Sequence, residues 1–269
     1  MEKPDVSVVI PAKNSETFLP STLKSLEAQT LKPKSIIVVD DGSSDNTAKV
    51  SEEHGALTIR MPDIGRYATG TPHIAKVINR GMKEALKQDS DYVMISGSDD
   101  IFPRTYIEKI VEELEKNDRL VMASGYVVGE PWDTRNPRGG GRVIRTSFLR
   151  MVGLYPLNFG WETYPIFKAL SLGLEAKAFP VPFHSSRPSS RNPIKYYYLG
   201  KGMKVLNYWS LHAWGRIMLV FFHHPLEGSW MLSGYLSESS TYMDLKGFVS
   251  GQQKRDFLRR IRRVMMNSL

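Results

Sequence analysis

Three apolar runs early in the chain end in polar or small residues. The runs are Val6–Ile10, Ile36–Val39 and Tyr92–Ile95, and they lead into Pro11–Asn14, Asp40–Ser44 and Ser96–Asp100 respectively. Strands that are buried on both faces of a parallel sheet are almost continuously apolar, and open α/β sheets bind ligands at the carboxyl ends of their strands. The pattern therefore predicts three buried strands that present polar groups at one edge of a sheet.

Helical periodicity separates these strands. Thr71-Pro72 places a capping hydroxyl before a proline, and Pro103 opens a second predicted helix. The first predicted helix contains Phe18, Leu23 and Leu26 and accepts Pro20 only in its first turn. We assign Asp45 and Thr47 to the start of another helix. Alternating strands and helices predict an α/β fold with a mainly parallel central sheet flanked by helices.

After about residue 125 the pattern changes. Proline and glycine are frequent from Pro131 to Gly141, which predicts a long mobile loop. A short helix at 148–152, a loop at 159–163, a helix that ends near Leu172 and a strand at 178–181 are expected to follow. We predict one domain over 1–190, with a nucleotide-binding half at 1–125 and an acceptor half at 126–190.

The remaining residues, 191–269, are expected to form a helical region rich in aromatic and basic side chains. The run Trp209–Phe222 is too short to span a bilayer, and its pattern suits either a packed helix or one that lies on a membrane. The last helix places Phe257, Leu258 and Ile261 on one side and arginines on the other.

The chain carries a net charge of +8, and its basic excess is concentrated near the end. Between Lys246 and Arg263 there are seven lysines and arginines, and Asp256 is the only acid. A solvated helix face and an anionic membrane surface both fit this run, whereas no nucleic-acid partner is expected.

There are no cysteines, which excludes disulfides and thiol nucleophiles. The polar start Met1–Asp5 does not resemble a signal peptide, so we expect a cytoplasmic protein, with peripheral association at the inner face of the cell membrane left open.

Paired carboxylates carry the candidate chemistry. Asp99 and Asp100 follow a predicted buried strand, next to the small residues Gly97 and Ser98. Mg²⁺ or Mn²⁺ accepts one or two carboxylates together with substrate phosphate oxygens, so this pair suits a cation held against a diphosphate. Alternatively, Asp100 only caps the following helix and Asp99 is solvated.

Taken together, these motifs resemble the family 2 inverting glycosyltransferases of GT-A fold. The matching segments lie between residues 5 and about 185, and they are Val6–Asn14, Ile36–Thr47, Ala75–Gly81, Ser98–Pro103 and Phe159–Glu162. The resemblance implies a nucleotide-diphosphate sugar donor, Mn²⁺ or Mg²⁺ as cofactor, and in-line displacement at the anomeric carbon. The acceptor is unknown, and lipid-linked and polysaccharide acceptors are both open.

The resemblance also implies site residues. The nucleotide sugar would be bound by Pro11, Ala12, Asn14, Asp41, Asn79 and Asp99, with Asp99 near the ribose or metal, and the metal by Asp100 and His184.

Two departures from the family pattern affect the chemistry. Gly97 stands where many members carry a further aspartate, and Glu162-Thr163 replaces the usual acceptor-site Glu-Asp pair. We predict that Glu162 is the catalytic base, partly desolvated by its aromatic neighbours, with Asp133 as the next candidate.

Other functions fit the sequence less well. A sugar nucleotidyltransferase would begin with a glycine- and arginine-rich phosphate loop, and neither a dinucleotide-binding nor a P-loop glycine motif follows the first strand. A non-catalytic module that binds a nucleotide sugar or a lipid stays open, because the Asp-to-Thr change at Thr163 suits a site that binds without turnover.

Overall fold

The computed structural model describes residues 3–65, 70–187 and 192–266, with the side chains of 260 and 262–266 excepted. The chain packs as two compact units. Unit 1 comprises Met1–Ala68, His73–Tyr155 and Leu172–Ser189, and unit 2 comprises Thr69–Pro72, Pro156–Ser171 and Ser190–Leu269. Residues 156–171, which the sequence placed in the acceptor half, thus pack with the C-terminal helices. The predicted basic residues Arg260, Arg262 and Arg263 have side chains outside the described part.

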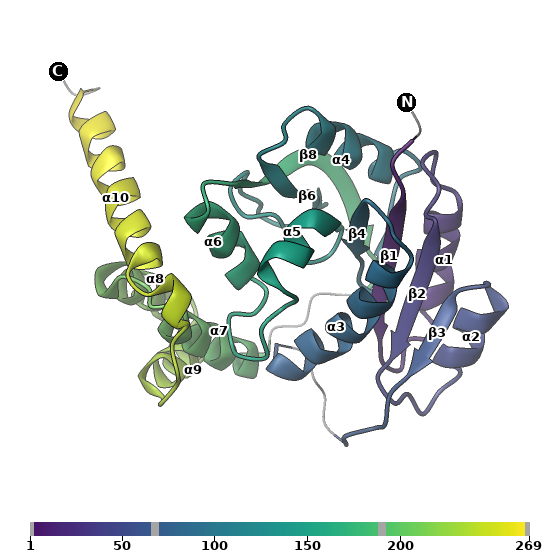
Figure 1. Ribbon diagram of the computed structural model, residues 1–269. Helices are drawn as coiled ribbons and strands as arrows, with labels where there is room; N and C mark the ends of the chain where they lie inside the picture. The colour runs from purple at the N-terminus through teal and green to yellow at the C-terminus, as the bar shows by residue number, and fades with distance from the viewer. Residues whose placement is uncertain (1–2, 66–69, 188–191, 267–269) are drawn as a thin grey trace. The chain divides into compact units, whose positions relative to one another are not determined.

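Unit 1 is built on a central sheet (Figure 1). Within the described residues its strands are β1 (Val6–Ala12), β2 (Ser35–Asp40), β3 (Leu57–Arg60), β4 (Tyr92–Ile95), β5 (Asp100–Ile101), β6 (Leu120–Val127), β7 (Arg142–Arg145) and β8 (Glu175–Ser185). They lie in the order β3-β2-β1-β4-β7-β6-β8-β5. The three strands predicted from the apolar runs are therefore neighbours.

The sheet is mainly parallel, as the sequence predicts. β1 pairs in parallel with β2 and β4, β2 with β3, and β6 with β8. β7 runs antiparallel between β4 and β6, and β5 antiparallel to β8. The sequence did not predict these two strands, because both are short and their pairing is entirely non-local.

Helices cover both faces of the sheet. The helices of unit 1 are α1 (Leu19–Glu27), α2 (Thr47–Glu53), α3 (Pro72–Lys87), α4 (Tyr106–Glu115) and α5 (Thr146–Val152). Apolar residues of α1 and α4 share a buried cluster with Val8 and Ile10 of β1, while α3 packs on the opposite face. There a side chain at Gly81 would lie 2.4 Å from Val9 Cγ1, so the glycine is what lets α3 pack tightly against the sheet. Burial of both faces explains the continuous apolar strands.

The predicted helix starts are confirmed with one shift. Pro20 lies in the first turn of α1, and Pro72 begins α3. The carboxylate of Asp45 accepts a hydrogen bond from the Thr47 backbone at the start of α2. By contrast, α4 begins at Tyr106 rather than at Pro103, because Pro103 belongs to a turn in which its carbonyl accepts from the Tyr106 N–H.

Unit 2 is helical. It contains α6 (Tyr164–Ser171), α7 (Pro193–Val205), α8 (Ser210–His223), α9 (Pro225–Leu236), the 3₁₀ turn η1 (Met243–Leu245) and α10 (Phe248–Met266). The run Trp209–Phe222 forms helix α8, which packs against its neighbours through one side only. Ala213 and Ile217 are buried on that side, and most other positions are exposed. None of the described helices is long and apolar enough to cross a membrane.

Candidate active site at the carboxyl ends of the sheet

The ends of β1 and β2 are joined directly. Ala12 lies opposite Asp40 in the parallel ladder, and the Asp41 N–H donates to the Ala12 carbonyl at 2.8 Å. Asp40 and Asp41 are both buried. Three of the predicted donor-binding residues, Pro11, Ala12 and Asp41, are thus adjacent at one edge of the sheet.

His73 forms a pair with Asp41 that the sequence did not predict. Its Nε2 lies 2.7 Å from Oδ1 of Asp41, so one carboxylate oxygen is already engaged. A buried carboxylate needs such a partner, because desolvation of an unpaired charge is costly. The position of His73 directly after Pro72 at the start of a helix was a signal for this role, since helix starts in α/β units face the carboxyl ends of strands.

Asn14 holds the turns after β1 and β2 together. Its backbone has φ of +46°, its N–H donates to Ser43 Oγ, and its Oδ1 accepts from the Ser44 N–H, both at 2.9 Å. Lys13 reaches across the same edge, donating to Asp63 Oδ1 at 2.6 Å and to the Asp41 carbonyl at 3.0 Å. The side chain of Asn14 therefore shapes this edge of the sheet.

Asn79 has a similar role on α3. Its side-chain N–H donates to the Tyr155 carbonyl at 2.7 Å, and its Oδ1 accepts from the Tyr155 N–H at 3.0 Å. Both ends of the amide fix the backbone after α5. Asn79 thus holds α3 to the segment after α5, and its amide keeps one further N–H and one further acceptor site.

Asp100 is the buried acid of the predicted metal pair. It is 6% exposed, and its Oδ2 accepts from the Gly97 N–H at 2.6 Å. Burial raises the pKa of Asp100 to about 7, while the Gly97 N–H opposes this rise and the nearby charge of Asp99 adds to it. A side chain at Gly97 would lie 3.0 Å from Asp100 Oδ2 and from Asp99 Oδ1, so it would crowd both carboxylates of the pair.

The predicted loop after β6 packs onto Asp100. Residues 128–141 contain no helix or strand, and a side chain at Gly140 would lie 2.7 Å from Asp100 Oδ2. Arg142 is 1% exposed and donates to the Pro137 and Arg138 carbonyls and to the Tyr155 hydroxyl. A buried guanidinium with these acceptors fixes the end of the loop. Sequence reasoning missed Arg142, because nothing in its local pattern marks it as buried.

Asp99 is fixed to the end of β8. Its carboxylate accepts from Ser185 Oγ at 2.9 Å, and its carbonyl accepts from the Ser186 N–H at 2.8 Å. In the β5–β8 ladder Asp100 lies opposite Ser185, and Ile101 lies opposite His184. Adjacent residues of a strand face opposite ways, so His184 and Asp100 lie on opposite faces of this ladder. The structure does not bring His184 to Asp100, and its metal role stays a prediction.

A basic group lies close to these acids. Arg187 follows β8, donates to Ser15 Oγ at 3.4 Å and stacks over the Phe18 ring. Ser15 in turn shares a buried hydrogen bond of 2.9 Å with Ser98. The polar edge of unit 1 therefore combines carboxylates, hydroxyls and a guanidinium, which are the groups that bind a cation, a ribose and a phosphate.

The residues present fit a divalent cation of the Mg²⁺ or Mn²⁺ type. Asp100 supplies a carboxylate between two glycines, and a Cβ at Gly97 or Gly140 would lie within 3.0 Å of its Oδ2. Across the described ranges, no three His, Asp or Glu side chains converge as a complete metal cage. An incomplete cage is typical of cations that take their remaining ligands from substrate phosphates and water.

Glu162 belongs to unit 2. It is exposed, in a turn where the Thr163 and Tyr164 N–H groups donate to the Gly160 carbonyl. Gly160 has φ of +75°, and a side chain there would lie 2.8 Å from Leu206 Cδ1, so this turn needs glycine. The partial desolvation predicted for Glu162 is not seen. The aromatic residue Phe159 instead stacks on Tyr198, with ring centroids 5.4 Å apart.

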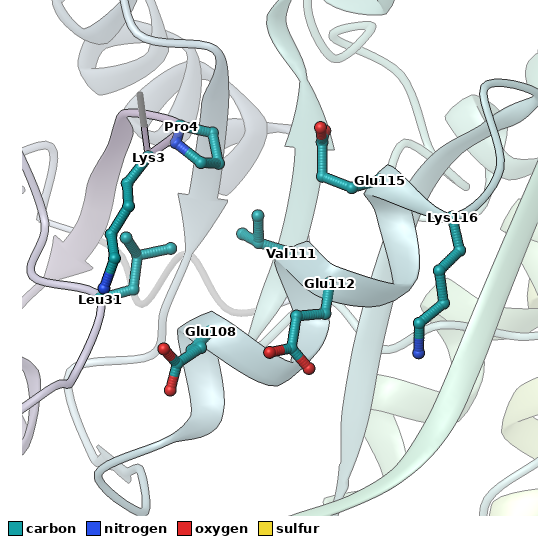
Figure 2. A pocket seen from close by; sticks show the side chains of 8 residues that line it. All are labelled: Lys3, Pro4, Leu31, Glu108, Val111, Glu112, Glu115 and Lys116. Carbon is teal, nitrogen blue, oxygen red and sulfur yellow. The ribbon is translucent and has the colours of Figure 1, made fainter. Parts of the chain in front are cut away.

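A separate cavity lies at the other end of the strands (Figure 2). It is lined by Lys3, Pro4 and Leu31 together with α4 side chains that include Glu108, Glu112 and Glu115. Lys3 and Pro4 precede β1, whereas the paired acids follow the carboxyl ends of strands. The cavity is therefore not part of the candidate site.

Comparison with known proteins agrees with this geometry. The sequence pattern described as glycosyl transferase family 2 matches residues 7–169. An uncharacterized glycosyltransferase of Haemophilus influenzae is 34% identical over 125 residues, which cover 46% of this chain and 37% of that protein. The undecaprenyl-phosphate 4-deoxy-4-formamido-L-arabinose transferase of Pseudomonas fluorescens is 29% identical over 165 residues, covering 58% of this chain and 44% of that protein. The chain spans only 34–38% of the length of four such relatives.

Solved structures share the fold. The mannosyltransferase PcManGT from Pyrobaculum calidifontis, in complex with GDP-Man and Mn²⁺, superposes with a TM-score of 0.60 at 15% identity, over 95% of this chain and 81% of that one. Staphylococcus aureus TarS 1–349, in complex with UDP-GlcNAc, gives 0.57 at 18% identity over 75% and 66%. The central sheet flanked by helices is thus the GT-A architecture. With the family pattern matched over more than half of its length, the chain belongs to glycosyl transferase family 2.

Proposed function

We propose that this protein transfers a sugar from a nucleotide-diphosphate sugar to an acceptor with inversion at the anomeric carbon, assisted by a divalent cation. The observation that carries the proposal is the buried Asp100 between Gly97 and Gly140 at the carboxyl edge of the sheet. Pro11, Ala12 and Asp41 would contact the base and ribose, with Asp99 at the ribose or metal. Asp100 would hold the cation.

When bound, the cation would neutralise charge on the leaving diphosphate. Glu162 would accept the proton of the acceptor hydroxyl, while that oxygen bonds to the anomeric carbon and the bond to the diphosphate breaks. Peripheral association with an anionic membrane surface, at the cytoplasmic face, is part of the proposal. A lipid-linked acceptor is supported by the relative whose name includes undecaprenyl phosphate.

The test is donor binding by calorimetry with the diphosphates of uridine and guanosine, in the presence of Mn²⁺ and of a chelator. We expect Asp100→Ala to remove the Mn²⁺-dependent part of the affinity and to keep the fold, because Asp100 lies on the two-residue edge strand β5 and is not part of the apolar core. Asp118→Ala is the matched control, since Asp118 is an exposed acid of unit 1. Affinity that is unchanged by metal in both wild type and Asp100→Ala would show that the site is assigned wrongly.

A second candidate is the non-catalytic binding module. It is favoured by Thr163, where the family pattern has an aspartate. Donor binding without hydrolysis or transfer, with every acceptor class tried, would support this alternative.

A further inference from the structure

The turn between α8 and α9 carries an unusual set of exposed apolar side chains. Leu219, Phe222 and Leu226, here called the hairpin tip, are 63%, 75% and 59% exposed. Single exposed apolar residues are common on soluble proteins, but several large ones within residues 219–226 at one helix turn mark a surface that contacts something else. The tip lies wholly within unit 2.

The exposure of the tip does not result from poor packing of the hairpin, because the inner side of the same hairpin is well packed. Ala213 and Ile217 of α8 and Met231 of α9 are buried together. A side chain at Gly228 would lie 2.4 Å from Phe221 Cα, so the two helices approach closely just below the turn. The hairpin therefore presents the tip on a defined scaffold.

The residues around the hairpin tip carry no permanent charge. Residues 217–226 contain no Asp, Glu, Lys or Arg, and their polar side chains are those of His223 and His224 at the turn. Outside this stretch, the side chains of Trp214, Arg216 and Trp230 are exposed. Tryptophan favours the interface between water and lipid, and an arginine can extend its guanidinium to head groups while its stem lies on apolar surface. The hairpin therefore has an uncharged turn, with tryptophan and arginine side chains in the adjoining parts of the two helices.

The charge of unit 2 identifies the kind of surface. Between residues 192 and 259 there are eight lysines and arginines against four acids. Lys254, Arg255 and Arg259 of α10 are exposed, and α10 is joined to the start of α8 through a hydrogen bond of 2.9 Å from the Trp209 N–H to Gln253 Oε1. A basic unit with an apolar tip is complementary to a layer of anionic lipid.

We propose that the hairpin tip inserts into one leaflet of an anionic phospholipid membrane and anchors unit 2 there without crossing it. Helices of 14 and 12 residues are too short to span the hydrocarbon core, and such insertion reaches only about 5–10 Å into the leaflet. This goes beyond the proposed transfer reaction in that it assigns the membrane contact to particular side chains of α8 and α9.

The experiment is flotation with phosphatidylcholine vesicles that contain or lack phosphatidylserine, at low and high salt. We expect the wild type to float with the anionic vesicles and to bind less as salt rises. Leu219→Ser with Phe222→Ser should lower the partition constant at least tenfold, because burial of one large apolar side chain changes partition by roughly tenfold or more. The matched control is Leu57→Ser with Met151→Ser, two exposed apolar residues of unit 1, and it should bind as the wild type does.

Two further measurements keep the test decisive. Circular dichroism must show the same helix content for all variants, and Phe222→Trp should be quenched by brominated lipid if the tip enters the leaflet. Equal flotation of the tip variant and the wild type would overturn the proposal. A dimer that the tip variant breaks in the absence of lipid would also overturn it, by assigning the tip to a second copy. Asp100→Ala should float normally, so a failure of donor binding is distinct from a failure of the anchor.

Discussion

Asp100 combines burial with a charge that the proposed metal binding requires. Burial raises its pKa to about 7, so between its ordinary value of 3.8 and this value the folded protein holds a proton that the unfolded chain has lost. The free energy of unfolding is therefore higher below pH of about 4, where Asp100 is protonated in both states. It falls as pH rises to about 7, because the buried carboxyl group then has to ionise. Glu130 adds to the repulsion at Asp100, and Arg138 opposes it.

The side chain of Asp100→Asn stays neutral at every pH, so this variant should not lose stability as pH rises. With a chelator present, we expect it to stabilise the protein by on the order of 2–4 kcal/mol at pH of about 8, and by much less at pH of about 4. Urea unfolding at the two pH values measures the difference, with Asp118→Asn as the exposed control. The same effect at both pH values would contradict a raised pKa at Asp100.

Glu162 is the second residue whose role depends on a proton. Glu162→Gln keeps the shape and the hydrogen-bonding capacity of the side chain but removes its basicity. We expect turnover to fall by roughly a hundredfold or more while donor affinity is unchanged. Glu238→Gln, an exposed acid elsewhere in unit 2, is the control for steady-state transfer assays. If Glu162→Gln turns over near the wild-type rate, the base lies elsewhere and Asp133 is the next residue to test.

At the scale of elements, two glycines determine how α7 and α9 pack. A side chain at Gly200 would lie 1.9 Å from the Met231 carbonyl oxygen, and one at Gly234 would lie 1.9 Å from that of Tyr197. Both contacts are to backbone, which cannot move aside without separating the helices. The close packing of these helices thus depends on the absence of Cβ atoms at two positions.

Gly200→Ala should therefore destabilise unit 2 by about 1–3 kcal/mol, the usual cost of overpacking. Gly215→Ala is the matched control on exposed α8, where a Cβ meets nothing within 4 Å. It should be neutral or stabilising by up to about 1 kcal/mol, because alanine favours the helix. Thermal unfolding of both variants checks this, and equal melting temperatures would show that the α7–α9 contact is not tight in solution.

At the scale of the whole molecule, the two units carry different chemistry. Unit 1 gathers buried acids at the carboxyl ends of its strands, and unit 2 displays apolar and basic side chains. Donor binding and membrane contact are therefore assigned to separate residues, which share no partner in the described structure. Variants of Asp100 and of the hairpin tip should act additively for this reason.

Local sequence patterns determined much of unit 1. The apolar runs identified β1, β2 and β4 and their polar ends, because burial on both faces demands continuous apolar residues. Pro20 and Pro72 marked helix starts correctly, since an α-helix accommodates proline only in its first turn. The same motifs, taken in order, were enough to indicate the family.

Long-range contacts decided the rest. The antiparallel position of β7, the burial of Arg142 and the pairing of His73 with Asp41 join residues far apart in the chain, and local periodicity carries no information about such pairs. The amides of Asn14 and Asn79 proved to be bound to backbone groups, which no motif distinguishes from ligand binding. The sequence by itself determined which residues stand at the strand ends, because burial shapes local patterns. Only the tertiary structure decided which of them pair, because pairing depends on the positions of distant segments.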